Sequence, residues 1–198
     1  MTRRRAIVRA SMLALVLGSY VAAAAPPGAA LQITTISPRL PTVYLVRADG
    51  KKVQLAAELD DGRPVVLNFI FTTCPGICPI MSHTFAMLQD KLRGESRQVH
   101  MVSISIDPEQ DTPARLRDYA KQFFAGKDWQ HYTGSVEASI AVQQAFGAYA
   151  GDKMRHDPVT FMRAAPNRPW ERIDGFASAD QLLSEFTRLM SAPAIVSR

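Results

Sequence analysis

Four features that would point to common partners, architectures or activities are missing from this sequence of 198 residues. The uncharged apolar stretch at residues 10–25 has 16 residues, whereas a membrane-spanning helix needs about 20. Four of the 23 basic residues lie in residues 1–30, and the other 19 nearly balance the 18 acidic residues, so no basic patch for nucleic acid is expected. There is no internal repeat, and no motif pairs a nucleophile with a general base, so a hydrolase is not indicated.

The composition is that of an ordinary folded protein. Hydrophobic residues make up 47% of the chain and charged residues 21%, which favours a globular domain over a disordered one. A chain of this length accommodates one domain with a sound core and, in addition, an export segment.

Residues 1–25 have the three-part pattern of a secretory signal peptide. A basic start at residues 3–5 leads into an apolar stretch and then into small residues at 22–25. An uncleaved membrane anchor is the alternative. Either would place the rest of the chain in the periplasm, or tethered to the outer face of the inner membrane, where cysteine pairs meet oxidants. Residues 26–41 then predict a linker, and residues 42–198 a single domain.

Strand patterns recur along that domain. Residues 42–46 and 51–55 flank an Asp-Gly turn and predict a β-hairpin. β-Branched and apolar runs predict further strands at residues 65–71, 99–106, 129–133, 157–163 and 170–173. The first of these runs is continuously apolar, so this strand is expected to be buried on both faces.

Helices are predicted between these strands. One starts at Ile80, and the others start at Thr112, at Ser135 and at Ser178, where a capping residue or a capping box precedes an apolar periodic pattern. The alternation predicts an α/β fold, a three-layer α/β/α sandwich with a central mixed sheet and an N-terminal β-hairpin.

The only two cysteines, Cys74 and Cys78, follow the first buried strand. The carboxyl end of such a strand is the usual place for a site in an α/β sheet. Residues four apart share one face of a helical turn, so both sulfur atoms can form a disulfide or bind one soft metal ion. A helix N-terminus, which Pro75 and Pro79 favour here, lowers thiol pKa values. A purely structural disulfide is the alternative, but closing so short a loop gains little stability.

A histidine would complete a metal site with the two thiols. Two thiolates suit Cu(I), and an added imidazole gives a site that also holds Cu(II). His83 is five positions after Cys78 and turns away from it, while His100 and His131 fall in predicted strands. His156 lies in a loop before a predicted strand, from which it can reach a site built by distant residues.

Two further sets of residues allow two interpretations each. Asp107 begins a pattern typical of a helix start, or it supports the site from behind the ligands. Four methionines carry soft thioether groups, although core packing is favoured at their positions; they are Met81, Met87, Met154 and Met162.

Several motifs resemble one known family. Residues 71–79, Phe-Thr-Thr-Cys-Pro-Gly-Ile-Cys-Pro, are similar to the signature of the Sco/SenC copper-chaperone family, and residues 103–113 resemble its second signature. Residues 129–134 and 146–149 also match, as does the position of His156 ahead of an apolar strand.

The resemblance implies both a fold and a function. It implies a thioredoxin-like domain in which Cys74, Cys78 and His156 bind copper as Cu(I) or Cu(II). The family assists assembly of the binuclear copper centre of cytochrome c oxidase, by copper delivery, by reduction of the target's cysteines, or both. The implied partner is the copper-centre subunit of the oxidase or another periplasmic copper or thiol protein, with a membrane contacted only through an N-terminal anchor.

Three classes of function stay open on the sequence alone. The first is a metallochaperone without catalytic turnover. The second is a thiol–disulfide oxidoreductase, with Cys74 as the attacking thiolate and Cys78 as the resolving thiol of a redox-active disulfide. The third is a protein that senses copper or redox state and signals by binding.

Overall fold

The protein is described by a computed structural model that covers residues 31–93 and 98–191. These residues belong to one structural unit that begins at Leu31. The predicted signal peptide or anchor at residues 1–25 lies outside the described part of the chain, so it stays a prediction. Within the described part, no helix is both long and apolar enough to span a membrane.

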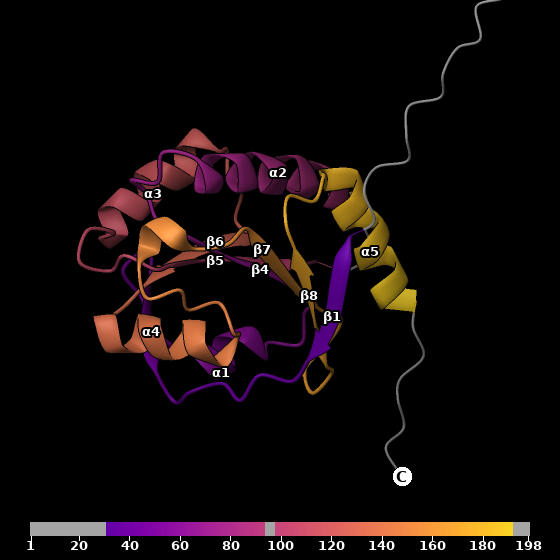
Figure 1. Cartoon of the computed structure of the whole chain (residues 1–198), viewed down its shortest axis with the longest axis horizontal. Helices are drawn as coiled ribbons and strands as arrows, with labels where there is room; N and C mark the ends of the chain where they lie inside the picture. The colour runs from indigo at the N-terminus through magenta and orange to yellow at the C-terminus, as the bar shows by residue number, and fades with distance from the viewer. Residues whose placement is uncertain (1–30, 94–97, 192–198) are drawn as a thin grey trace, which may run out of the picture. The chain divides into compact units, whose positions relative to one another are not determined.

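An eight-stranded mixed sheet forms the middle layer (Figure 1). Its strands are β1 (Gln32–Ile36), β2 (Tyr44–Arg47), β3 (Lys52–Gln54), β4 (Val65–Ile70), β5 (His100–Ser105), β6 (Trp129–Thr133), β7 (Val159–Arg163) and β8 (Trp170–Asp174). Their order across the sheet is β1-β8-β7-β4-β5-β6-β2-β3. Strands β4, β5 and β6 are parallel, and the outer strands pair antiparallel with their neighbours. The predicted hairpin is β2 and β3, and the strands predicted at residues 157–163 and 170–173 are β7 and β8, which pair antiparallel.

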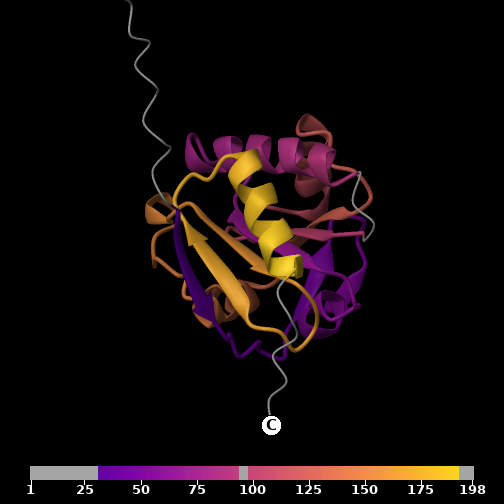
Figure 2. The same ribbon diagram turned by 90° about the vertical axis from the view of Figure 1, so that its right-hand side faces the viewer.

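Helices cover both faces of this sheet. They are α1 (Leu55–Leu59), α2 (Ile77–Leu92), α3 (Pro113–Gln122), α4 (Val136–Ala145) and α5 (Ala179–Ser191), with a short 3₁₀ helix, η1 (Lys153–Arg155). In Figure 1, α2 and α3 lie on one face and α1 and α4 on the other. Figure 2 looks onto α5, which covers the end of the sheet near β8 and β1. The three-layer prediction is confirmed.

Each face of the sheet packs its own apolar core. Strand β4 supplies both cores because alternate side chains point to opposite faces. Val65, Leu67 and Phe69 join the core under α1 and α4, whereas Val66 joins the core under α2 and α5. The side chains of β4 are all buried, as the uninterrupted apolar run predicts.

The predicted helix starts are largely confirmed. The Thr112 and Ser135 hydroxyls accept from backbone N–H groups three residues on, and Ser178 and Gln181 form a reciprocal capping box. Helix α2 starts at Ile77, three residues before the predicted start, because Pro79 occupies its first turn, where no N–H partner is needed.

Besides the short η1, which lies in a predicted loop, two elements were not predicted. The segment 26–41 was expected to be a linker, but its residues 32–36 form β1, which pairs antiparallel with β8. Edge pairing requires only backbone groups, so a short polar segment such as Gln-Ile-Thr-Thr-Ile gives little signal of it. The five-residue helix α1 was also missed, and it is capped by the side chain of Gln54.

Candidate metal centre

The two cysteines lie in the connection between the central strand and α2. After β4, a turn closes with the Cys74 amide donating to the carbonyl oxygen of Phe71 at 3.2 Å. Helix α2 then begins at Ile77, so Cys78 lies in its first turn. The Cys78 amide donates to the Cys74 sulfur at 3.3 Å, and the Phe71 amide donates to the Cys78 sulfur at 3.3 Å. Both cysteines are free thiols.

His156 reaches the same place because of the direction of β7. This strand runs antiparallel to β4, with Thr160 opposite Asn68, so its N-terminal end lies beside the carboxyl end of β4. His156 comes three residues before β7 begins, directly after η1. The sequence predicted a loop before a strand, and the sheet register explains how that loop arrives at the cysteines.

The three side chains converge. The Cys74 and Cys78 sulfur atoms and a ring nitrogen of His156 all lie within 4.8 Å of one another. The Cys78 sulfur is 3.4 Å from Nε2 of His156. Cys78 is fully buried and His156 nearly so, whereas Cys74 is half-buried. One edge of the group is therefore accessible from solvent, through Cys74.

Burial sets the protonation of the inner two groups. It raises the pKa of the Cys78 thiol well above its ordinary value, and the Phe71 amide that donates to the sulfur opposes this only in part. Burial lowers the pKa of His156, so at neutral pH its imidazole is uncharged and offers a lone pair. In the absence of metal the buried thiol keeps its proton, and a bound cation would displace it.

The donor set discriminates between metals. Two thiol sulfurs and one imidazole nitrogen suit copper, as Cu(I) through the sulfurs and as Cu(II) with the nitrogen added. Hard cations such as Ca²⁺ and Mg²⁺ need oxygen ligands, which the group does not supply.

The remaining histidines lie elsewhere. His83 is exposed on α2, and His131 is buried in β6 between the rings of Trp129 and Tyr119. His100 is opposite Val65, at the start of β5 and so at the far end of the sheet from the cysteines. None of the three is grouped with the two cysteines, as expected.

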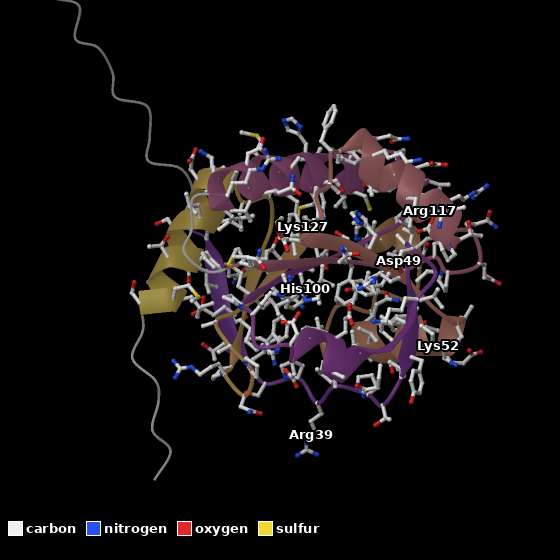
Figure 3. All side chains as sticks on the ribbon, turned by 180° about the vertical axis from the view of Figure 1, so that it is seen from behind. Arg39, Asp49, Lys52, His100, Arg117 and Lys127 are labelled. Carbon is white, nitrogen blue, oxygen red and sulfur yellow. The ribbon has the colours of Figure 1, made fainter. Side chains whose placement is uncertain are left out.

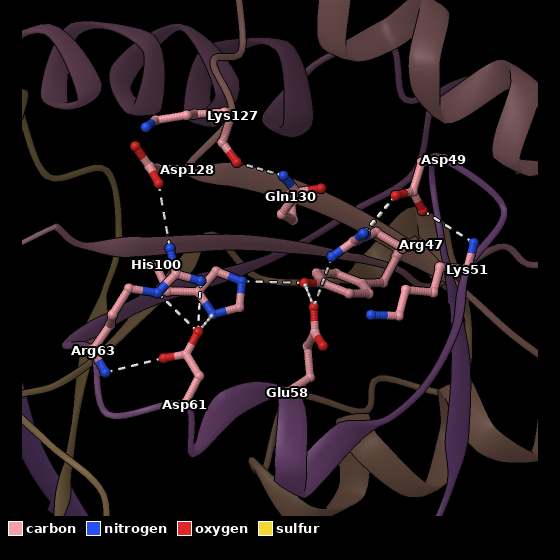
Figure 4. A network of polar contacts seen from close by, with 11 residues as sticks. Arg47, Asp49, Lys51, Glu58, Asp61, Arg63, His100, Lys127, Asp128 and Gln130 are labelled. Atoms are coloured by element: carbon pink, nitrogen blue, oxygen red, sulfur yellow. Dashed lines mark hydrogen bonds and ion pairs between the residues drawn. The ribbon is translucent and has the colours of Figure 1, made fainter.

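His100 belongs to a polar network at that far end (Figure 4). Its Nε2 is 3.1 Å from the hydroxyl of Tyr132, which donates to Glu58 at 2.8 Å. Glu58 also pairs with Arg47, and Asp61 lies 3.4 Å from the other ring nitrogen of His100. Figure 3 shows His100 within the molecule and, for contrast, Arg39 pointing away from it. The network ties α1 to the sheet.

The four methionines divide into two pairs. Met81 and Met162 are buried in the core, as the packing interpretation predicts. Met87 and Met154 are 45% and 57% exposed, so core packing does not account for them.

The metal group is supported by residues that sequence reasoning largely missed. Asp107 is buried, and one of its carboxylate oxygens lies 2.5 Å from Nζ of Lys153, on η1. This favours the interpretation of Asp107 as a supporting residue. Asp111 is also buried and accepts hydrogen bonds from Thr72 and Ser105. In the sequence it belongs to the motif at residues 103–113 that resembles the second family signature, and no role was predicted for it.

A cavity of about 430 Å³ adjoins the site. His156, Asp107 and Lys153 line one side of it, and the half-exposed rings and aliphatic groups of Tyr149 and Val136 line another. A partner side chain placed in this cavity would lie next to the imidazole.

Comparison with known proteins gives a consistent result. The SCO1/SenC family profile matches residues 42–191. The chain is 39% identical over 93 residues to the SCO1 protein homolog of Bacillus subtilis, an alignment that covers 46% of this chain and 47% of that protein. The chain spans about half or less of the length of the curated relatives that it matches.

Solved structures agree with the family match. The copper-bound crystal structure of Arabidopsis thaliana ScoI is similar with a TM-score of 0.65 and 27% identity, covering 74% of this chain and 94% of that one. BsSco, described as a member of the Sco family of cytochrome c oxidase assembly proteins with a disulfide switch, gives a TM-score of 0.64 and 26% identity, covering 80% and 98%. The predicted thioredoxin-like α/β fold is confirmed by these similarities.

Proposed function

The chain belongs to the SCO1/SenC family, and on that premise we propose that it is a copper metallochaperone for assembly of the binuclear copper centre of cytochrome c oxidase. Copper is its cargo. The observation that carries the proposal is the convergence of Cys74, Cys78 and His156 within 4.8 Å, three ligand atoms brought from two distant segments.

The proposed roles of the three residues follow from their burial. Cys78 and His156 hold the ion from the interior, where few solvent molecules compete for it. Cys74 is the accessible ligand, and a cysteine of the receiving protein can approach the ion on this side and replace it first. The copper-bound structure of the Arabidopsis relative supports copper as the cargo of this fold.

A second function of the same residues is reduction of the receiving protein's cysteines. The Cys74 thiolate would attack a disulfide of the client and form a mixed disulfide, releasing one client thiol. Cys78 would then attack Cys74, release the second client thiol and close a Cys74–Cys78 disulfide. Two electrons and two protons pass from this chain to the client. The two free, adjacent thiols favour this reaction, as does the disulfide switch described for BsSco.

The proposed location is outside the cytoplasm, in the periplasm or tethered to the outer face of the inner membrane. The signal-like pattern of residues 1–25 supports this proposal. The copper-binding domain predicted at residues 42–198 contains the family match at 42–191, and we extend it to Leu31 so that it includes β1.

Copper loading of the reduced chain under anaerobic conditions tests the function. We expect about one copper per chain and, for the Cu(II) form, a visible thiolate-to-copper charge-transfer band. Cys74→Ser and Cys78→Ser should each abolish the band, whereas Ser82→Ala, on the same helix, should keep it. A copper content near zero in the wild-type chain would reject the chaperone function and favour the thiol reductant.

A further inference from the structure

Asp111 is a buried carboxylate directly behind the cysteine loop. It lies between β5 and α3, and its side chain is fully buried. Isolated buried charges are costly, and proteins retain them where hydrogen bonds or ion pairs compensate. Among the described residues no ion pair to Asp111 is found, so hydrogen bonds must offset the free-energy cost of burying this carboxylate.

Those hydrogen bonds come from two segments. The Thr72 hydroxyl donates to Oδ1 at 2.6 Å, and the Thr72 amide lies 3.2 Å from both carboxylate oxygens. The Ser105 hydroxyl donates to Oδ2 at 2.6 Å. Thr72 is two residues before Cys74, inside the turn that the Cys74 amide closes on Phe71. Asp111 therefore fixes the start of the loop that carries the first sulfur.

The same carboxylate is linked to the histidine side of the site. The Ser105 hydroxyl donates its single proton to Asp111, and its oxygen accepts from the Asp107 amide at 3.0 Å. The Asp107 carboxylate pairs with Lys153, which is three residues before His156. A continuous series of polar contacts thus joins the two segments that supply the ligands.

We propose that Asp111 is a positioning residue that holds the Cys74 turn in its metal-binding geometry and, through Ser105 and Asp107, in register with the His156 loop. The inference rests on the proposed copper function and deepens it. A carboxylate is required because every group that faces it is a donor. An amide at this position would present its own N–H₂ group to at least one of them.

The test compares Asp111→Asn with Asp118→Asn, an acid-to-amide change on exposed α3, in the full chain. Copper is loaded anaerobically, and two quantities are measured: the rate of copper loss to excess chelator and the position of the Cu(II) charge-transfer band. Loss of a residue that orients metal ligands typically costs 10–100-fold in metal affinity. We expect about tenfold faster loss or more, with a shifted band, for Asp111→Asn and wild-type behaviour for Asp118→Asn.

Milder variants keep the test decisive if Asp111→Asn does not fold. Thr72→Val and Ser105→Ala each remove one hydroxyl donor, and we expect a smaller shift of the band in folded protein. A wild-type band and release rate in a folded Asp111→Asn variant, or in both milder variants, would overturn the positioning role. Failure of the wild-type chain itself to bind copper would reject the proposed function, which is a different result.

Discussion

Nε2 of His156 lies 3.4 Å from the sulfur of Cys78, although the two residues are 78 positions apart in the sequence. The contact is a consequence of topology. Strands β4 and β7 are antiparallel neighbours, so the segment that precedes β7 must lie beside the segment that follows β4. A loop histidine thereby becomes a buried group in contact with a buried thiol.

His156→Ala should weaken copper binding without affecting the two thiols. The imidazole is the nitrogen donor that favours Cu(II), so Cu(II) should lose affinity by at least the 10–100-fold typical of a lost supporting residue. Cu(I), which two thiolates hold alone, should lose less. Chelator competition measures both affinities, and His83→Ala, which removes an exposed histidine of α2, is the matched control. Equal Cu(II) affinity in the two variants would show that His156 is not a copper ligand.

The two thiols should differ in reactivity in the metal-free chain. Cys74 is half-buried, whereas Cys78 is fully buried and its pKa is raised by that burial. An alkylating reagent at pH 7–8 should therefore modify Cys74 at least about ten times faster, the factor that one unit of pKa gives in thiolate fraction. Mass spectrometry of the single variants Cys74→Ser and Cys78→Ser measures the two rates. Equal rates would contradict the assignment of Cys74 as the accessible ligand and attacking thiol.

The sequence predicted much of the fold because local signals agreed with the tertiary structure. The buried run before Cys74, the caps at Thr112 and Ser135 and the capping box at Ser178 each act over a few residues. Strand β1 escaped prediction because edge pairing is decided by a partner far along the chain, β8, and not by its own residues.

The sequence alone identified the two cysteines as site residues, but it did not identify the residues that hold them in place. A Cys-x₃-Cys spacing after a buried strand carries its chemistry in the sequence. Asp111 does not, because its role depends on Thr72 and Ser105, which the parallel pairing of β4 and β5 brings beside it. His156 is an intermediate case. The sequence predicted that it lies in a loop, but only the family resemblance implied that it joins the two cysteines.

Lys153→Met should destabilise the fold as well as the site. The change removes the ammonium group, which lies over the Phe71 ring, and leaves the buried Asp107 carboxylate without its cation. Loss of a charged hydrogen-bond partner by a buried group costs about 1–3 kcal/mol of unfolding free energy. Urea denaturation of the metal-free chain measures the loss. Lys121→Met, which breaks an exposed pair with Asp118, should change stability by no more than about 0.5 kcal/mol. Similar small effects in both variants would show that the Lys153 pair is solvated.

The chain should lose stability in mild acid through His131. This ring is enclosed in β6, its Nε2 has no hydrogen-bond partner within the described residues, and burial lowers its pKa to about 4. Above pH 6.5 the ring is neutral in the folded and unfolded chain alike, so it adds no pH dependence. Between pH 6.5 and pH 4 only the unfolded chain takes up the proton, so folding becomes less favourable as the pH falls. A shift of this size corresponds to about 3 kcal/mol.

His131→Gln isolates that contribution. The buried amide should make the variant less stable than the wild type at pH 7. Because the amide cannot be protonated, the gap in unfolding free energy between the two proteins should narrow by about 3 kcal/mol from pH 7 to pH 4. The pKa values of His100 and His156 are also lowered, and both residues are present in both proteins, so their effects cancel in the difference. Urea titrations of the metal-free chains at a series of pH values give the gap directly. A gap that stays constant with pH would mean that the folded chain accepts a proton at His131, and therefore that water reaches a ring which the packing of β6 encloses.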